Sequence, residues 1–293
     1  AHDGTQILEI LTDLLINNWS EVPPVITWAT YDPTIDWAHA ENTGLGEIDT
    51  PGDYDLAART ADRIDMYSLV SALATSGLGY IYEDSLGRIS YADSTHRSQY
   101  LAANGYTDLS AAQALSNGMA VQTRAGDIRN EITIKYGANS ANETTPFDDA
   151  DSIAVYGLLA QIISTTLKNH ADADAQAAFY LKLRAYPQAM FNQITYELTS
   201  PELDDGDRDS LINIFMGLPL RISDMPLNMA AGTYLGFVEG WTFRASYNEL
   251  AVTLLMSPLA YSLQAMQWAD VPPSETWASV SPVLDWANAT IVS

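Results

Sequence analysis

ALATSGLGYIYEDSLGRISY, residues 72–91, joins a helical pattern to two short strand patterns. The helical part belongs to a longer apolar series with the spacing of one helix face: Met66, Leu69, Val70 and Leu73. Two glycines then end this helix. The runs 80–83 and 88–91 follow, separated by a turn that ends in glycine, which predicts a β-hairpin. We therefore expect a helix over 62–75, a hairpin after it, and a chain of mixed α and β structure.

Towards the N-terminus, Thr5–Asn17 carries leucines and isoleucines at helical spacing and predicts another helix. Asp3, with Gln6 three residues later, resembles a capping box at its start. From 19 to 55 the chain is rich in Pro, Gly, Thr and Asp, which predicts extended structure. After the hairpin, an Ala-rich stretch predicts a short helix near Leu109–Leu115.

Strand patterns dominate the second half of the chain. Ile128–Tyr136 alternates apolar and polar residues, with Asn130 as the exception on the apolar side. Asp172–Tyr186 has an Ala- and Leu-rich side and predicts a helix. Four more strand-like runs follow: Phe191–Leu198, Leu211–Ile222, Tyr234–Tyr247 and Leu250–Met256. This order of elements predicts the α+β class.

We expect five segments along the chain. They are an N-terminal helix (1–18), an extended Trp/Pro strap (19–55), a helix and hairpin domain (56–126), a β-rich domain (127–265) with a helical insertion at about 150–186, and a C-terminal Trp/Pro strap (266–293).

The two straps contain an internal repeat. WSEVPPVITWATYDPTIDWAHA (19–40) and WADVPPSETWASVSPVLDWANA (268–289) are identical at 12 of 22 positions. Tryptophans recur every nine residues within each copy: Trp19, Trp28 and Trp37, then Trp268, Trp277 and Trp286. The prolines exclude regular helix and central strand. The rings could close the chain's own fold, bind a neighbouring subunit as interface or packing residues, or stack on sugar rings.

The charge is strongly acidic, with 13 basic against 37 acidic residues and a net charge of −24. Such a field repels phosphate, so we expect no specific binding of nucleic acid. It could reflect a solvated surface, adaptation to high salt, or a surface past which DNA slides. No apolar run reaches the length of a membrane span, so we expect no stable membrane insertion. The chain lacks a signal peptide and an initiator Met, which suggests a processed product or a segment of a longer protein.

We find no motif for catalysis, a cofactor or a metal. There is no cysteine, and the four histidines are scattered and predicted to lie at the surface. The run Asp204–Asp209 lacks the glycine and glutamate of a calcium loop and predicts a solvated turn. Other acidic clusters, Asp148 to Asp151 and Asp172 with Asp174, suit helix starts. Glu239 is the acid inside an apolar strand pattern; an outward-facing position is favoured over a functional one. Spacing alone does not single out a catalytic carboxylate pair.

The order of several motifs resembles the tail-hub group of minor tail proteins of siphophages that infect actinobacteria. The matching stretches are 72–91, Asp127–Ile134 with its central asparagine, Ser152–Gly157, Asp172–Tyr186 before Pro187, and Phe237–Pro258. They cover roughly residues 55 to 293. This sequence departs from the family in its Leu-Gly hairpin turn, and it starts at a helix where hubs commonly carry a β-rich domain.

The resemblance implies β-rich hub domains with small barrel-like sheets and a structural role in the virion. Such a subunit forms a ring, commonly a homotrimer, that closes the tail tube at the tail tip. Its expected partners are itself, the distal tail protein, other minor tail proteins and the tape measure protein in the lumen. The alternative is a module that binds host-surface glycan, which would expose several tryptophans to an aqueous quencher. A salt-adapted hydrolase is a third possibility, and it would need a cleft with paired carboxylates.

Overall fold

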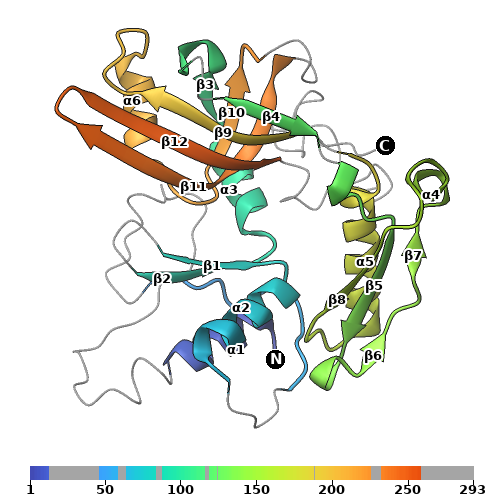
Figure 1. Cartoon of the computed structure of the whole chain (residues 1–293). Coiled ribbons are helices and arrows are strands. Elements are labelled where there is room, and N and C mark those ends of the chain that lie inside the picture. The colour runs from blue at the N-terminus through green and yellow to red at the C-terminus, as the bar shows by residue number, and fades with distance from the viewer. Residues whose placement is uncertain are drawn as a thin grey trace, which may run out of the picture. The chain divides into compact units, whose positions relative to one another are not determined.

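The structure is a computed structural model that describes residues 1–12, 46–58, 64–83, 88–115, 119–123, 125–187, 189–225 and 232–258. These residues form two compact units. The first holds the described residues up to His96 and those from 125 to 187; the second holds 97–123 and those from 189 onwards. The described part of the chain contains six α-helices and three open sheets (Figure 1). The predicted α+β class is confirmed. The three described sheets are open and form no barrel, and the predicted straps lie outside the described residues except for 46–55.

The first unit contains four helices and two sheets. Its helices are α1 (Asp3–Thr12), α2 (Met66–Ser76), α4 (Ala150–Tyr156) and α5 (His170–Arg184), with short 3-10 turns η4 (Ala125–Asp127) and η5 (Ala138–Ser140). Its strands are β1 (Tyr80–Glu83), β2 (Ile89–Ala92), β5 (Glu131–Tyr136), β6 (Asn142–Glu143), β7 (Phe147–Asp148) and β8 (Ala160–Ser164).

Residues 72–91 fold as predicted, into the end of a helix followed by a hairpin. Asp65 caps α2 by accepting a hydrogen bond from the backbone N–H of Ser68, and Gly77 follows the last helical residue. Leu69 and Leu73 are both buried on the predicted face. β1 and β2 then pair as an antiparallel hairpin.

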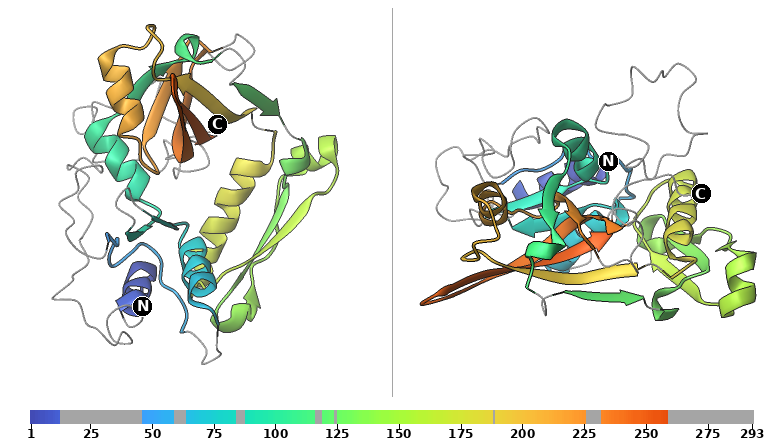
Figure 2. Two further views of the ribbon diagram at one scale, coloured as in Figure 1. Left: turned by 60° about the vertical axis from the view of Figure 1, so that its left-hand side comes forward. Right: turned by 90° about the horizontal axis from the view of Figure 1, so that it is seen from above.

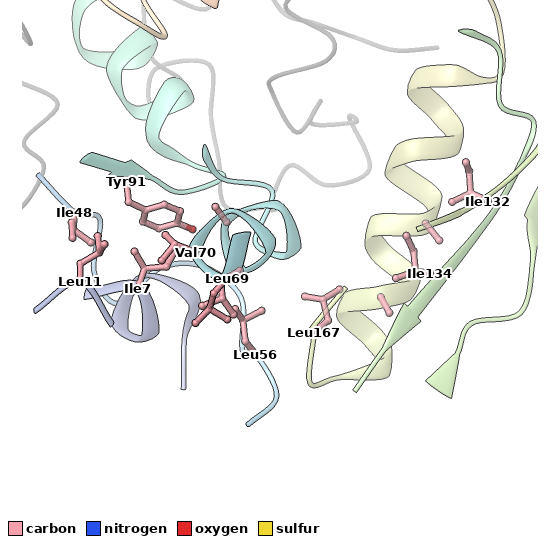
Figure 3. Packing of buried hydrophobic residues seen from close by; sticks show 14 residues of the cluster. Ile7, Leu11, Ile48, Leu56, Leu69, Val70, Tyr91, Ile132, Ile134 and Leu167 are labelled. Atoms are coloured by element: carbon pink, nitrogen blue, oxygen red, sulfur yellow. The ribbon is translucent and has the colours of Figure 1, made fainter. Parts of the chain in front are cut away.

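One apolar core holds the first unit together (Figure 3). It joins α1 and α2 to the hairpin and to the sheet around β5. Its members include residues that are fully or almost fully buried: Ile7, Leu11, Ile48, Leu56, Tyr91, Ile132, Ile134 and Leu167. In that sheet β5 is central, because β6 and β7 pair with one edge and β8 runs parallel along the other. Ala173 and Ala177 of α5 are fully buried, and small side chains allow a helix to approach a sheet closely.

The second unit is built on one six-stranded sheet. Its strands are β3 (Thr107–Ser110), β4 (Ala120–Thr123), β9 (Ala189–Glu197), β10 (Pro219–Ser223), β11 (Tyr234–Ser246) and β12 (Glu249–Pro258), in the order β3-β10-β11-β12-β9-β4. It also contains η3 (Ala111–Gln113) and α6 (Asp205–Ile212). Helix α3 (His96–Asn104) begins with His96 of the first unit and continues in the second.

Three of the four strand-like runs predicted after the Ala-rich helix are confirmed as β9, β11 and β12. The prediction of a strand across 211–222 was wrong, because this range contains the end of α6, a loop and β10. The Asp204 side chain accepts a hydrogen bond from the backbone N–H of Asp207 and so caps the start of α6. This helix continues to Ile212.

The short helix predicted near Leu109–Leu115 is confirmed only as the 3-10 turn η3 (Ala111–Gln113). The α-helix of this stretch lies earlier, as α3, and Leu109 belongs to β3, which pairs in parallel with β10. This pairing joins Leu109 to Ile222, more than a hundred residues away, so local pattern alone could not reveal it. No helix in the described ranges is both long and apolar enough to span a bilayer.

Candidate assembly interface

The six tryptophans of the straps lie outside the described residues, so their roles stay predictions: Trp19, Trp28, Trp37, Trp268, Trp277 and Trp286. The seventh, Trp241, is described and half-buried in β11. No sequence motif assigns Trp241 a role, although it lies in the longest strand of the described chain.

β11 is paired along one side but only at its start along the other. β12 pairs with it from Gly236 to Ser246, whereas β10 pairs only with Tyr234 to Phe237. From Glu239 to Ser246, no described strand lies along this second edge. Figure 2 shows the β11–β12 hairpin extending past its neighbouring strands. We call residues 239–246 the free edge of β11; unpaired backbone groups of this kind can accept a further strand.

The free edge also carries part of the sheet's apolar face. Trp241 and Phe243 share one face, because alternate residues of a strand point to the same side. They lie opposite Leu254 and Val252, which are completely buried, yet Phe243 is 43% exposed. The apolar face that is buried at Leu254 and Val252 therefore continues onto the free edge, where it is partly exposed.

Glu239 begins the free edge and is held by a buried arginine. The register of β11 against β12 shifts between Val238 and Gly240, which makes Glu239 the extra residue of a β-bulge. The Arg97 guanidinium donates to both of its carboxylate oxygens, at 2.7 and 3.0 Å, and the Ser257 hydroxyl donates at 2.5 Å. Arg97 also lies over the Phe237 ring, with Cζ 5.3 Å from its centroid. Glu239 is thus an ion-paired residue, and the outward-facing interpretation was wrong.

Two motifs that carry the family resemblance meet in the first unit. Asn130 is completely buried, and its amide donates to the Gly157 carbonyl at 2.7 Å and to the Ser152 hydroxyl at 3.3 Å. Its side-chain oxygen accepts from the backbone N–H of Leu159 at 2.7 Å. The Ser152 hydroxyl donates to the Ala185 carbonyl at 2.5 Å. We call these contacts the polar latch. They explain why an asparagine interrupts the apolar pattern of 128–136.

Asp3 occupies a buried site instead of capping α1. Its side chain accepts from the Tyr91 hydroxyl at 2.6 Å and the backbone N–H of Tyr54 at 3.3 Å. Gly52 and Gly77 make room for it, because a Cβ at either position would collide with the carboxylate. Burial raises the pKa of Asp3 to about 6.

The prediction of a capping box was wrong for the second partner as well. The Gln6 amide donates to the Ala1 and Leu56 carbonyls, at 3.1 and 3.4 Å, and so ties the N-terminal residues to a distant segment.

The prediction of surface histidines was wrong for His96. Its ring is almost completely buried, and Nδ1 lies 2.7 Å from Oδ2 of the equally buried Asp49. Asp93 accepts from the backbone N–H groups of Thr95 and His96, at the start of α3. Burial, followed by the charge of Asp49, raises the pKa of Asp93. His2 and His170 are exposed, and His39 lies outside the described residues.

Across the described ranges, no three His, Cys, Asp or Glu side chains are grouped to hold a metal ion. The acidic clusters serve helix starts as predicted: Asp149 caps α4 and Asp172 lies in the first turn of α5. Asp204 does the same for α6, so the run 204–209 is a helix start and not a solvated turn.

Neither a known family model nor a curated protein sequence matches the chain. Several solved structures are similar to it at low identity. A tail protein from Neisseria meningitidis MC58 is 14% identical with a TM-score of 0.44, and the match covers 68% of this chain and 58% of that one. The 43 kDa tail protein of prophage MuSo2 from Shewanella oneidensis is 12% identical with a TM-score of 0.43, and the match covers 89% of this chain and 65% of that one. A prophage tail protein from Listeria monocytogenes EGD-e is 12% identical with a TM-score of 0.38, and the match covers 84% of this chain and 63% of that one. The match thus spans less than two thirds of each of these proteins.

Proposed function

We propose that this chain is a structural subunit of a phage tail, and specifically a hub-type minor tail protein of the tail tip in siphophages that infect actinobacteria. The order of the matching motifs supports this role. The structural role of two of these motifs supports it as well, because Asn130 and Ser152–Gly157 form the polar latch. These are packing roles, in keeping with a subunit that assembles and carries out no catalysis.

The free edge of β11 is the observation that carries the proposal. It combines an edge along which no described strand pairs with the half-exposed Phe243, on a hairpin that extends past the neighbouring strands. In a ring, each copy would add this edge to the sheet of the next copy, and a homotrimer is the expected closed form. Barrel-like closure of the sheets would then arise between copies. The six strap tryptophans would bind the same or an adjacent copy.

Neighbours follow from the same proposal. The ring would contact the distal tail protein and other minor tail proteins, and the tape measure protein would pass through its lumen. The net charge of −24 suits a channel along which DNA moves without binding.

Replacing Phe243 with Lys tests the free edge. Two neighbouring edges would then meet with an added charge in place of an aromatic ring, which opposes edge-to-edge pairing. We expect the wild-type chain to form trimers in sedimentation velocity runs over a concentration series. The Phe243→Lys variant should dissociate at concentrations roughly tenfold higher or more.

Tyr247→Lys is the matched control, because Tyr247 is 99% exposed and lies in the turn beyond the free edge. It should leave assembly unchanged. A strict monomer at every concentration, or equal assembly of the wild-type chain and Phe243→Lys, would contradict the ring. Binding of host-surface glycan by a monomer with freely quenched tryptophans would favour the glycan-binding alternative.

A further inference from the structure

The chain around Gly52 covers the carboxyl group of Asp3, and we call residues 49–54 the flap. Asp3 lies in α1; its Oδ1 faces Gly52 of the flap, and its Oδ2 faces Gly77 at the end of α2. A Cβ built on Gly52 would lie 2.0 Å from Oδ1, and one built on Gly77 would lie 2.1 Å from Oδ2. The two glycines therefore pack directly against the carboxyl group, which is completely buried.

The two walls of this site are held differently. The backbone N–H of Gly77 donates within α2, so that wall belongs to a helix. Gly52 lies in a segment without helix or strand. Two backbone hydrogen bonds from α1 hold this segment, with the carbonyls of Tyr54 and Pro51 as acceptors at 3.0 and 3.1 Å. The flap is therefore the wall that can move at small cost.

The flap carries a buried carboxylate of its own. Asp49 is only 6% exposed. Its Oδ2 accepts from the backbone N–H of Asp93 at 2.9 Å and lies 2.7 Å from Nδ1 of His96. Within the described ranges, no donor reaches its Oδ1. A buried carboxylate oxygen without a donor opposes the closed arrangement, because water would solvate it in an open one.

The surroundings of both carboxyl groups are mainly acidic. The titratable groups near them come from the flap and its flanks, the hairpin, the loop after β2 and the start of α3: Glu47, Asp53, Asp55, Tyr80, Tyr82, Tyr91, Asp93 and His96. Asp55 also lies 3.8 Å from the N-terminal amino group and from Nζ of Lys168.

The closed flap favours the protonated form of Asp3. Burial raises the pKa of Asp3 from 3.8 to about 6, and the charge of Asp93 adds to the rise. Burial, and then the charge of Asp49, raise the pKa of Asp93. An open flap would expose Asp3 to water and return its pKa towards the ordinary value. The proton of Asp3 is therefore bound more tightly when the flap is closed.

We propose that the flap is a proton-dependent switch, which is closed while Asp3 is protonated and opens when Asp3 loses its proton. The charged carboxylate gains water when Gly52 moves away, and the same movement exposes Asp49. The opening stays local, because Ile48 and Leu56, on either side of the flap, are buried in the core. These residues end the predicted strap 19–55, so the switch sets how firmly that end is attached to the fold.

Amide hydrogen exchange, resolved by residue, tests the switch at a concentration where the chain is monomeric. The N–H groups of Thr5 and Tyr54 report on the flap, since they donate to Pro51 and to Asp3. From about pH 5 to about pH 7.5, their protection factors should fall roughly tenfold after correction for intrinsic exchange rates. Moderate urea should leave this exchange unchanged, because a local opening exposes little surface. Amides inside β5 should be better protected and sensitive to urea.

Two pairs of variants separate the switch from general effects of charge or strain. Asp3→Asn should abolish the pH response, whereas Asp127→Asn, at an exposed acid of the same unit, should keep it. Gly52→Ala places a Cβ against Asp3 at a positive φ of 84° and should lower the protection of the flap roughly tenfold already at pH 5. Gly126→Ala, whose Cβ would meet nothing within 4 Å, should not change it.

Three results would overturn the switch. Equal protection of the flap and β5, with the same response to urea, would mean that Asp3 loses its proton only through unfolding of the whole unit. A pH response that survives in Asp3→Asn would assign it to another group. Unchanged protection of the flap between the two pH values in the wild-type chain would show that the proton does not control it.

Discussion

At the scale of single residues, the buried carboxylate of Asp3 makes the protein's stability depend on pH. The folded chain raises its pKa from 3.8 to about 6 through burial, although the Tyr91 hydroxyl opposes that shift. The folded state therefore holds the Asp3 proton more tightly than the unfolded state does. Stability from this group is fully present below about pH 4 and is lost as the pH rises through 6.

Asp3→Asn should remove this dependence. In the wild-type chain, lowering the pH from about 7.5 to about 5 should raise the free energy of unfolding by about 1.4 kcal/mol through Asp3. The variant should lack that increment, since an amide does not titrate. Urea denaturation at both pH values measures the difference.

Asp127→Asn is the control for the general loss of negative charge, because Asp127 is an exposed acid of the same unit. It should keep the full response to pH. If Asp3→Asn and Asp127→Asn respond alike, the pH dependence belongs to the overall charge and not to the buried site.

At the scale of elements, the β11–β12 hairpin depends on the bulge at Glu239. The bulge directs this carboxylate to Arg97, whose side chain is only 8% exposed. A guanidinium buried to that extent needs a charged or hydrogen-bonding partner. The contact therefore fixes the base of the strand whose outer half is the free edge.

Glu239→Gln should lower the free energy of unfolding by about 1–3 kcal/mol, measured by urea denaturation. The amide keeps one acceptor but removes the negative charge that faces the Arg97 guanidinium. The lower half of that range is expected, because Glu239 itself is one third exposed.

Glu249→Gln makes the same change in the same hairpin. Glu249 pairs with Arg244 at 3.7 Å, and the Arg244 side chain is 76% exposed. This control should change stability by less than about 0.5 kcal/mol. Equal losses in the two variants would show that burial of Arg97 does not set the strength of the pair.

Elements with strong local signals were predictable, and those fixed by distant partners were not. α2, its hairpin, α5, β5 and the long strands β11 and β12 follow from periodicity and from turn residues. β3 is four residues long and depends on a parallel partner far along the chain. The strand pattern at 211–222 failed because a cap at Asp204 starts a helix there.

The contacts of the candidate interface were harder to predict than the strands that carry them. The sequence places Glu239 in a strand, but the bulge that turns it to Arg97 is a matter of register, which a single sequence does not encode locally. The uncovered part of β11 depends on where β10 ends. Asn130 stands out in the sequence as a polar residue on the apolar side of its strand, but its hydrogen-bond partners come from other segments of the chain.

At the scale of the whole molecule, the net charge of −24 means that repulsion among acidic residues is opposed by only a small number of attractive ion pairs. Exposed ion pairs such as Lys135 with Glu143 contribute about 0–1 kcal/mol each. With only 13 basic residues, such pairs cannot offset the repulsion among 37 acidic ones. Folding brings these charges closer together, so the repulsion acts against the folded state.

Added salt should therefore stabilise the protein. Raising NaCl from about 0.02 M to about 0.5 M shortens the screening length from roughly 20 Å to a few ångströms and weakens repulsion over most of the surface. We expect the thermal unfolding midpoint to rise by several degrees, measured by circular dichroism at about pH 7.5 and at a concentration where the chain is monomeric. The rise should shrink at about pH 4, where many carboxylates are protonated. A midpoint that falls with salt would show that attractive pairs, and not net charge, dominate the surface electrostatics.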